Sequence, residues 1–265
     1  MLTSTRSEHV SRLRRLHDRK GRKRSGTFLA EGPDCVHAAV EAGWVLEVVG
    51  LEGHPMAAWI QEQGLPFHSA SEHVVASICD AVTPQGVVAE CRLPQTRFDD
   101  VAAGTGPVIV CDRISDPGNF GTIVRTAEAV GAAGVVATEG SVDPWNAKVV
   151  RASAGSVFRV PVVGGFSSPV VMTRIAETRR TIALNGSADL DVFEMLTHLS
   201  EQRIPSDQLA WVVGSEAHGV SDEVLAGAEF STRIPMAPLV ESLNAGIAVA
   251  VCLYSAQDRL GTSAT

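Results

Sequence analysis

Short, continuous apolar runs that alternate with helical patterns are the strongest constraint on the fold of this chain. Residues 107–111 (PVIVC), 135–138 and 209–213 are such runs. They are typical of strands that are buried on both faces of a parallel sheet. The pattern of residues 120–130 predicts a helix that ends at Gly131, and helices of this kind connect parallel strands. The second half of the chain is therefore predicted to be an α/β domain with a parallel sheet.

The first half shows the same alternation on a smaller scale. Residues 27–31 and 86–91 are strand-like, and residues 33–42 have a helical pattern that begins with proline. The stretch 95–106 contains two glycines and two aspartates and is predicted to be a linker. We therefore expect three parts: a basic arm with a smaller α/β domain (1–94), the linker (95–106) and the larger domain (107–265).

Composition limits the class of protein. The chain has 265 residues, of which 45% are hydrophobic and 20% are charged, as in ordinary globular proteins. No apolar run approaches the roughly 20 residues that a membrane-spanning helix needs. The polar N-terminus lacks the apolar stretch of a secretory signal, so we expect a cytoplasmic protein with no membrane partner.

Charge is distributed unevenly along the chain. Residues 1–24 hold nine Lys/Arg and two Asp/Glu, a net charge of +7, whereas the other 241 residues hold 13 basic and 28 acidic side chains, a net charge of −15. A basic arm on an acidic protein favours a polyanionic partner, nucleic acid first. Within the arm we single out Arg22, Lys23 and Arg24 as RNA-binding candidates. The alternative is a frayed terminus whose charges are only solvated.

The five cysteines and eight histidines show no recognisable ligand spacing. The cysteine number is odd and no two cysteines are close in sequence, which argues against disulfides and against a Cys-x-x-Cys zinc site. No H-E-x-x-H pattern is present. We therefore expect buried free thiols and no metal.

Three segments that follow predicted strands carry candidate chemistry. Residues 116–125 (DPGNFGTIVR) place Asn119 at a helix start, where a cap is its structural alternative, and turn Arg125 away from the apolar side of that helix. An ion pair with Glu128 is the structural alternative for Arg125. All three segments lie at the carboxyl edge of the predicted sheet, where open α/β sheets bind ligands.

The second segment, residues 213–219 (VGSEAHG), runs from a buried strand into a glycine-rich loop. Glycines there allow close approach of a ligand to the backbone. Glu216 lies in the bend, and His218 is a weaker candidate for a base.

The third segment, residues 234–244, passes from a strand through a Pro-x-x-Pro loop to the start of an apolar helix. Ser242 is a candidate N-cap, and free backbone N–H groups at that helix start can receive a ligand. Together these features predict an apolar slot with backbone donors, which suits an adenine or a thioether. The chain contains no P-loop and no G-x-G-x-x-G after the first strand of the larger domain, so common nucleotide sites are not indicated.

The three segments together resemble the SpoU (TrmH-like) family of RNA ribose 2′-O-methyltransferases, in the SPOUT class. The likeness spans residues 107–257, and the stretch 148–156, which includes Arg151, also resembles a family segment. Ala217 is a departure, because the family commonly has glycine there. More weakly, the first half resembles the small α/β RNA-binding domain that precedes the catalytic domain in several members.

This resemblance implies a parallel sheet whose C-terminal segment forms a trefoil knot, and a homodimer with its site near the subunit interface. The donor would be S-adenosylmethionine, held by Gly214, Ile234, Met236 and Leu243. Catalysis would fall to Arg125, supported by Asn119, Glu216, Ser242 and Asn244. RNA would be bound by the arm residues and Arg151.

Arg125 cannot readily act as a base, because a guanidinium stays protonated. We therefore expect it to hold the nucleotide and stabilise charge while the ribose 2′ oxygen attacks the methyl group. An additional N-terminal domain favours ribosomal RNA, the large subunit first, over tRNA. The competing hypotheses are a tRNA 2′-O-methyltransferase, a non-catalytic RNA-binding or ribosome assembly factor with the same fold, and an unrelated α/β nucleotide-binding enzyme.

Overall fold

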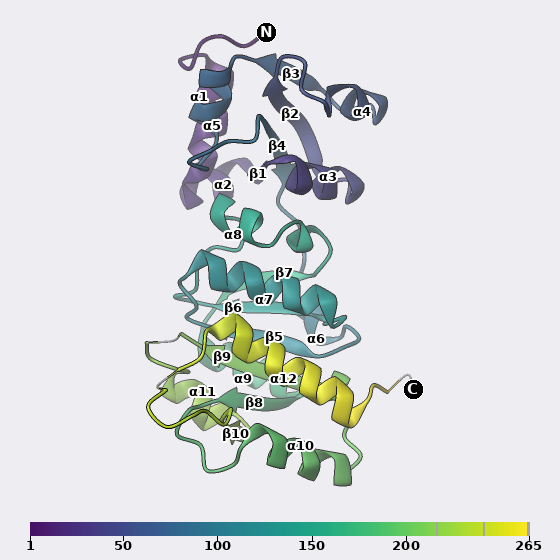
Figure 1. Ribbon diagram of the computed structural model, residues 1–265, viewed down its shortest axis with the longest axis vertical. Coiled ribbons are helices and arrows are strands. Elements are labelled where there is room, and N and C mark those ends of the chain that lie inside the picture. The colour runs from purple at the N-terminus through teal and green to yellow at the C-terminus, as the bar shows by residue number, and fades with distance from the viewer. Residues whose placement is uncertain (216, 241, 264–265) are drawn as a thin grey trace. The chain divides into compact units, whose positions relative to one another are not determined.

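The computed structural model describes residues 1–215, 217–240 and 242–263, and the chain divides into two compact units (Figure 1). Unit 1 comprises residues 1–95 and 145–159, and unit 2 comprises residues 96–144 and 160–265. None of the described helices is long and apolar enough to cross a membrane.

Unit 1 contains a four-stranded sheet in the order β1-β4-β2-β3. Only β2 and β3 are parallel, because β4 lies between β1 and β2 and runs antiparallel to both. The sheet of the smaller α/β domain is therefore mixed, unlike the parallel sheet predicted for the second half, since strand–helix alternation does not fix the direction of a strand that returns through a loop. The elements are α1 (Glu8–Arg14), η1 (Arg15–His17), α2 (Arg19–Ser25), β1 (Thr27–Glu31), α3 (Pro33–Glu41), β2 (Val45–Leu51), α4 (Ala57–Glu62), β3 (Phe67–Ala70), α5 (Glu72–Ile78), β4 (Val87–Arg92), α8 (Ala147–Ala152) and η2 (Ser156–Phe158).

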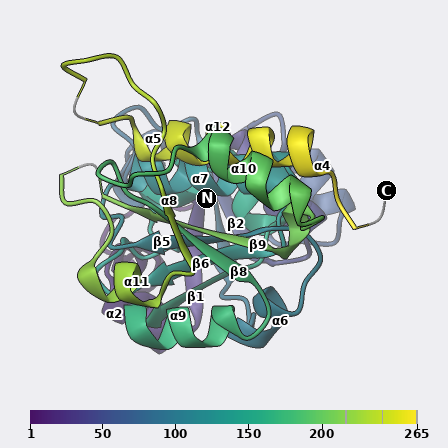
Figure 2. The same ribbon diagram turned by 90° about the horizontal axis from the view of Figure 1, so that it is seen from below.

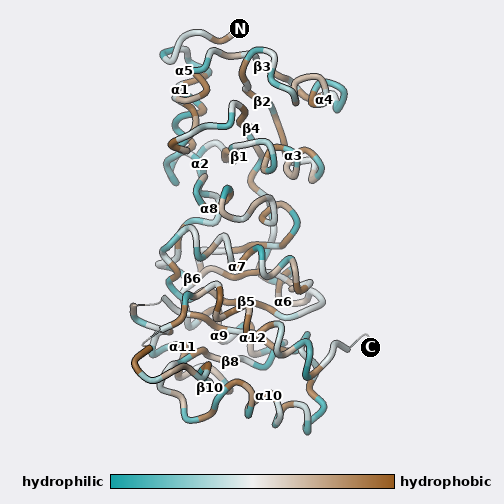
Figure 3. Tube along the Cα trace, in the orientation of Figure 1, coloured by the Kyte–Doolittle hydropathy of each residue, from teal (hydrophilic) through white to brown (hydrophobic). Residues whose placement is uncertain are grey.

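The basic arm is a folded part of unit 1. It forms α1, η1 and α2, and α2 is hydrophilic along its length (Figure 3). Val10, Leu13 and Leu16 are buried in a cluster with residues of β1, β2, β4 and α5. Burial of three apolar side chains stabilises the folded arm by several kcal/mol, at roughly 1.5–3 kcal/mol for each fully buried side chain. The arm is therefore not a frayed terminus.

Residues 145–159 pack with unit 1, although the sequence assigns them to the larger domain. Trp145 and Phe158 lie against Phe28 of β1, with ring centroids 5.1 and 5.9 Å apart, and Phe158 also contacts Trp44. The chain passes into unit 2 after this segment: η2 ends in unit 1, and β7 begins at Val162 in unit 2.

Unit 2 contains a six-stranded, all-parallel sheet in the order β10-β8-β9-β5-β6-β7, as the apolar runs predict. Helices α7, α10 and α12 cover one face, and α6, α9 and α11 cover the other (Figures 1 and 2). The elements are α6 (Phe98–Ala102), β5 (Val108–Asp112), α7 (Pro117–Ala129), β6 (Gly134–Thr138), β7 (Val162–Phe166), α9 (Ser168–Ala176), β8 (Arg180–Leu184), α10 (Val192–Glu201), η3 (Ser206–Gln208), β9 (Leu209–Gly214), α11 (Asp222–Gly227), β10 (Phe230–Thr232) and α12 (Ala245–Leu260).

The segment 95–106, expected to be a linker, contains α6 instead. Phe98 and Val101 are buried in the core of unit 2, which explains why this short helix forms between polar residues. Polar composition concealed it, because only one side of the helix is apolar.

The cysteines are free thiols, as expected. Four are buried and Cys79 is partly buried. Burial raises the pKa of Cys35 to about 11 and that of Cys79 to about 12, so both remain protonated at neutral pH.

Candidate active site and RNA-binding surface

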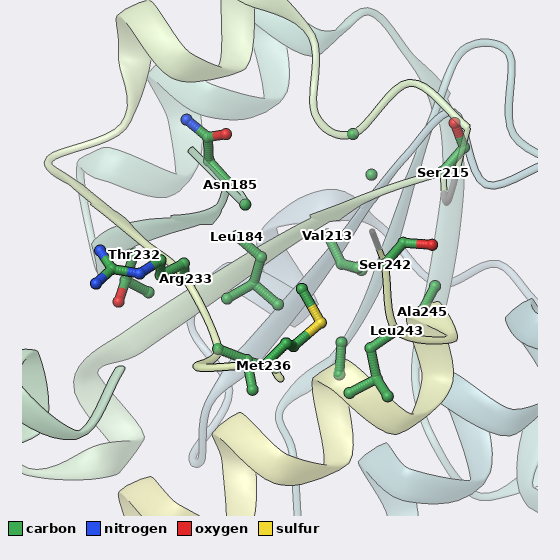
Figure 4. A pocket seen from close by; sticks show the side chains of 15 residues that line it. Leu184, Asn185, Val213, Ser215, Thr232, Arg233, Met236, Ser242, Leu243 and Ala245 are labelled. Carbon is green, nitrogen blue, oxygen red and sulfur yellow. The ribbon is translucent and has the colours of Figure 1, made fainter. Parts of the chain in front are cut away.

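A cavity of about 250 Å³ opens where β8, β9 and β10 end and α12 begins (Figure 4). The four residues expected to hold the donor, Gly214, Ile234, Met236 and Leu243, all line it, and so does Ser242. The other lining residues are Leu184, Asn185, Gly186, Val213, Ser215, Gly219, Thr232, Arg233, Ala245 and Ala248.

The cavity combines apolar walls with main-chain polar groups. Leu184, Met236 and Leu243 point into the same space, with Asn185 and Arg233 at its edge (Figure 4). Arg233 donates to the carbonyls of Ala188 and Asp189, which fixes the loop after β8. The arrangement can enclose an apolar or aromatic group and can offer backbone hydrogen bonds to its polar edges.

Gly214 is required at the end of β9 by close backbone contact. A Cβ atom there would lie 1.9 Å from the carbonyl oxygen of Gly219. Ser215 and Gly219 form an isolated bridge, and the Gly219 N–H donates to the Ser215 carbonyl at 2.8 Å. This tight loop shapes one wall of the cavity. Glu216 lies outside the described residues.

Asn119 and Asn244 connect the first and third candidate segments, residues 116–125 and 234–244. The Nδ2 group of Asn244 donates to Oδ1 of Asn119 at 2.7 Å. Asn119 does not cap α7: Asp116 is the N-cap, and its side chain accepts from the Asn119 N–H at 2.7 Å. The structural alternative for Asn119 is therefore wrong, and its side chain instead joins α7 to the start of α12.

The N-cap of α12 is Asn244, not Ser242 as expected. The Oδ1 atom of Asn244 accepts from the N–H groups of Gly246 and Ile247, at 3.0 and 3.3 Å. A Cβ atom on Gly246 would lie 2.7 Å from Cγ2 of Thr122, so the two helices need glycine where they meet. Ser242 is left free of the capping role and lines the cavity.

Arg125 and His218 are both exposed. Arg125 lies six residues after Asn119 on α7, and at 100° per residue it therefore lies on a different side of the helix. Neither residue is among the described residues that line the cavity. His218 lies in the loop after β9, where its N–H donates to Oγ of Ser215 at 3.3 Å.

A buried carboxylate that the sequence analysis overlooked holds the loops around the sheet edge. Asp112 ends β5 and is fully buried. It accepts from the Ser221 N–H at 2.7 Å, the Ser168 hydroxyl at 2.6 Å and the Thr138 hydroxyl at 3.1 Å. The sequence carried one signal for this role: Asp112 directly follows an apolar run. A carboxylate buried together with a strand needs hydrogen-bond donors from neighbouring segments.

The RNA-binding candidates fall into two groups. Lys23 and Arg24 are exposed on α2. Arg22 is 3% exposed and donates to the carbonyls of Leu16 and His17, so its guanidinium holds the turn between η1 and α2.

Arg151 is also occupied within unit 1. Its guanidinium donates to Glu31 at 2.6 Å and to Asp80 at 3.3 Å. Two carboxylates therefore neutralise it, and an RNA contact through Arg22 or Arg151 disagrees with these partners.

Residues 106–254 match the SpoU rRNA Methylase family, and residues 7–89 match the MRM3-like substrate binding domain. The chain belongs to the SpoU rRNA methylase family.

Relatives cover almost the whole chain. It is 29% identical over 254 residues to the 23S rRNA (guanosine(2553)-2′-O)-methyltransferase RlmP of Bacillus subtilis, covering 96% of this chain and 97% of that protein. It is 35% identical over 272 residues to an uncharacterised tRNA/rRNA methyltransferase of Synechocystis, covering 100% of this chain and 96% of that protein. The crystal structure of the SpoU methyltransferase AviRb from Streptomyces viridochromogenes, in complex with AdoMet, is similar with a TM-score of 0.81 and 27% identity, covering 95% of this chain and 97% of that one.

Replacement of Asp112 tests its role in holding the sheet edge. Asp112→Ala leaves the Ser221 N–H and two hydroxyls without their acceptor, and we expect it to lower the free energy of unfolding by about 3 kcal/mol. Asp112→Asn keeps one acceptor and should cost less. Urea unfolding measures both, with the exposed Asp258→Asn as control. Equal stability of Asp112→Ala and Asp258→Asn would contradict the role.

Proposed function

We propose that this protein is an S-adenosylmethionine-dependent RNA ribose 2′-O-methyltransferase that acts on ribosomal RNA, large-subunit RNA first. The observation that carries this proposal is the cavity at the ends of β8, β9 and β10, because two of the three family motifs meet there. The family match supports the same reaction, and so does the relative RlmP, which is named as a 23S rRNA 2′-O-methyltransferase and is similar over 97% of its length.

The cavity fits the proposed donor by its chemistry. The walls offered by Met236 and Leu243 suit an adenine ring or a thioether chain, and Gly214 allows backbone groups to approach closely. Ile234 completes the set of residues that would hold the donor. When bound, S-adenosylmethionine supplies a methyl group on a sulfonium sulfur, which is already a good leaving group. Acceleration then depends mainly on the positioning of the ribose hydroxyl.

The polar residues of the motifs would position the RNA. The Asn119–Asn244 hydrogen bond fixes the start of α12 relative to α7, and so fixes the wall that Leu243 provides. The Arg125 guanidinium stays protonated, so we assign it to holding a phosphate and stabilising developing charge. Ser242 and Glu216 would orient the ribose beside it, as the family resemblance implies.

Methyl transfer to RNA tests the function directly. Wild-type protein is incubated with labelled S-adenosylmethionine and with separated ribosomal and transfer RNA from cells that lack the gene, and the 2′-O-methyl position is mapped. We expect label in large-subunit RNA. Arg125→Ala should lower turnover about a hundredfold or more, and Arg125→Lys should remain well below wild type because the planar fork is lost.

The other outcomes separate the competing hypotheses. Label in tRNA alone would assign the enzyme to that substrate. Donor binding without label in either RNA would indicate another RNA or an assembly intermediate as substrate. Absence of donor binding would contradict the enzyme and leave an RNA-binding factor. Near wild-type turnover of Arg125→Lys would reject the assigned role of Arg125.

The exposed face of the arm would select the RNA. Arg14, Arg15, Lys23 and Arg24 are exposed. The apolar residues of α1 and η1 are buried, and α2 is held by the buried guanidinium of Arg22, so the charges lie on a folded surface. Ribosomal RNA, the proposed substrate, is met in the cytoplasm, which is the location expected from the sequence.

Substitution of the arm charges, rather than deletion of the arm, tests this surface without damage to the core. The double variant Lys23→Gln/Arg24→Gln should weaken RNA binding. The slope of the logarithm of the RNA-binding constant against the logarithm of salt concentration should be less steep in this variant by roughly 0.7–0.9 for each lost phosphate contact. The exposed Arg97→Gln serves as control. RNA binding measured across salt concentrations decides the matter, and an unchanged slope in the double variant would exclude these two residues.

We further propose that two copies of the chain form the complete site. Among the described residues, Arg125 does not line the cavity of its own chain. The Arg125 that completes each site would therefore come from the second copy. Leu239, Ile247 and Tyr254 are exposed apolar residues on the loop before α12 and on α12 itself. Ile247 and Tyr254 are seven residues apart and so share one side of the helix.

Light scattering of the purified protein tests this pairing. We expect a dimer for the wild type and a shift toward monomer, with loss of methyl transfer, for Ile247→Asp/Tyr254→Asp. Asp258→Asn, on the same helix, should leave the dimer intact. A monomeric wild type that transfers methyl groups at full rate would contradict the proposal.

A further inference from the structure

Three titratable side chains from distant parts of the sequence converge in unit 1. His9 lies on α1, Glu47 on β2 and His68 on β3. The Nε2 atom of His9 lies 2.8 Å from Oε1 of Glu47, and Nε2 of His68 lies 3.0 Å from Oε2 of the same carboxylate. One potential ligand atom from each of the three residues lies within 4.8 Å of the other two. The cluster is unrelated to the cavity in unit 2.

The two imidazole rings approach Glu47 from different directions. Their planes are nearly perpendicular, at 87°, with centroids 5.0 Å apart. The Glu47 side chain is 15% exposed, and those of His9 and His68 are 25% and 39% exposed. The cluster is therefore held by packing yet is accessible from solvent.

The charges around the cluster leave it negative. Arg12 donates to Glu47 Oε1 at 2.5 Å and to both oxygens of the buried Glu90 at 2.6 Å. One guanidinium thus faces two carboxylates, and with neutral imidazoles the net charge is −1. The hydrogen bond from the Arg12 guanidinium stabilises the carboxylate form of Glu47, which is the form that can act as a ligand.

We propose that His9, Glu47 and His68 form a binding site for one divalent ion of the zinc type. Two imidazole nitrogens and one carboxylate oxygen form a donor set that zinc accepts, with a fourth position for water or another oxygen. A cavity of about 350 Å³ lined by Glu8, His9, Arg12 and Glu47 supplies the space for that fourth ligand. Arg12 would hold the ligating carboxylate from outside, as second-sphere donors commonly do.

Such an ion would join α1, which belongs to the arm, to β2 and β3 of the sheet. The ordinary alternative is that each imidazole N–H donates a hydrogen bond to Glu47 without any ion. The two differ in their response to glutamine at position 68, because a glutamine amide can donate to Glu47 but is a poor zinc ligand.

Zinc titration of the full-length protein tests the site. Protein treated with a chelator and dialysed is titrated with ZnCl₂ in a calorimeter, and with CoCl₂ while its visible absorption is recorded. We expect one ion per chain. His68→Gln and His9→Gln should each weaken binding by more than about tenfold, the lower end of what loss of a second-sphere partner costs. His37→Gln is the matched control, because His37 is an exposed histidine of the same unit that is paired with Glu41.

Thermal unfolding supplies a second readout. Zinc should raise the Tm of the wild type and of His37→Gln, but not that of His68→Gln, whose Tm without zinc should equal the wild-type value. Wild-type affinity no greater than that of His68→Gln would overturn the proposal, as would an equal Tm response of all variants. Methyl transfer is not measured, so failure here leaves the proposed function untouched.

Discussion

The buried carboxylate of Asp112 imposes an order on unit 2 on which its site depends. A charge taken out of water must be met by hydrogen-bond donors, and three segments supply them: the end of β6 at Thr138, the start of α9 at Ser168 and the residue before α11, Ser221. Strands β5, β6 and β9 are thereby linked not only along their lengths but also at the edge where they end. The loop that forms one wall of the cavity ends at Gly219. Ser221 follows two residues later, and its N–H group donates to Asp112, which anchors that end of the loop.

The sequence predicted unit 2 well because its strands are buried on both faces. A run such as residues 107–111 has no other easy interpretation, and motif residues directly after such runs were expected at one edge; Gly214, Ile234, Met236 and Leu243 do line one cavity. Caps were harder to predict. Asp116 rather than Asn119, and Asn244 rather than Ser242, take the capping roles, because several neighbouring polar residues can cap a helix and packing selects among them.

Contacts made across long sequence separations were beyond sequence reasoning. The charge of the arm suggested its partner, but its three apolar side chains gave too short a pattern to predict that α1 and η1 enter a core. Arg22 and Arg151 look like free cations in the sequence, yet each meets acceptors that folding brings together. The same holds for His9, Glu47 and His68, whose spacing matches no ligand motif because each comes from a different element.

Because residues 145–159 belong to unit 1, the two units are not two consecutive, independent stretches of the chain. The polypeptide passes from one unit to the other three times, after residues 95, 144 and 159. A fragment that begins at residue 96 would leave Trp145 and Phe158 without the aromatic neighbours Phe28 and Trp44. Recombination that exchanged residues 1–95 alone would break the same aromatic contacts. Residues 1–95 and 145–159 are therefore expected to be inherited together.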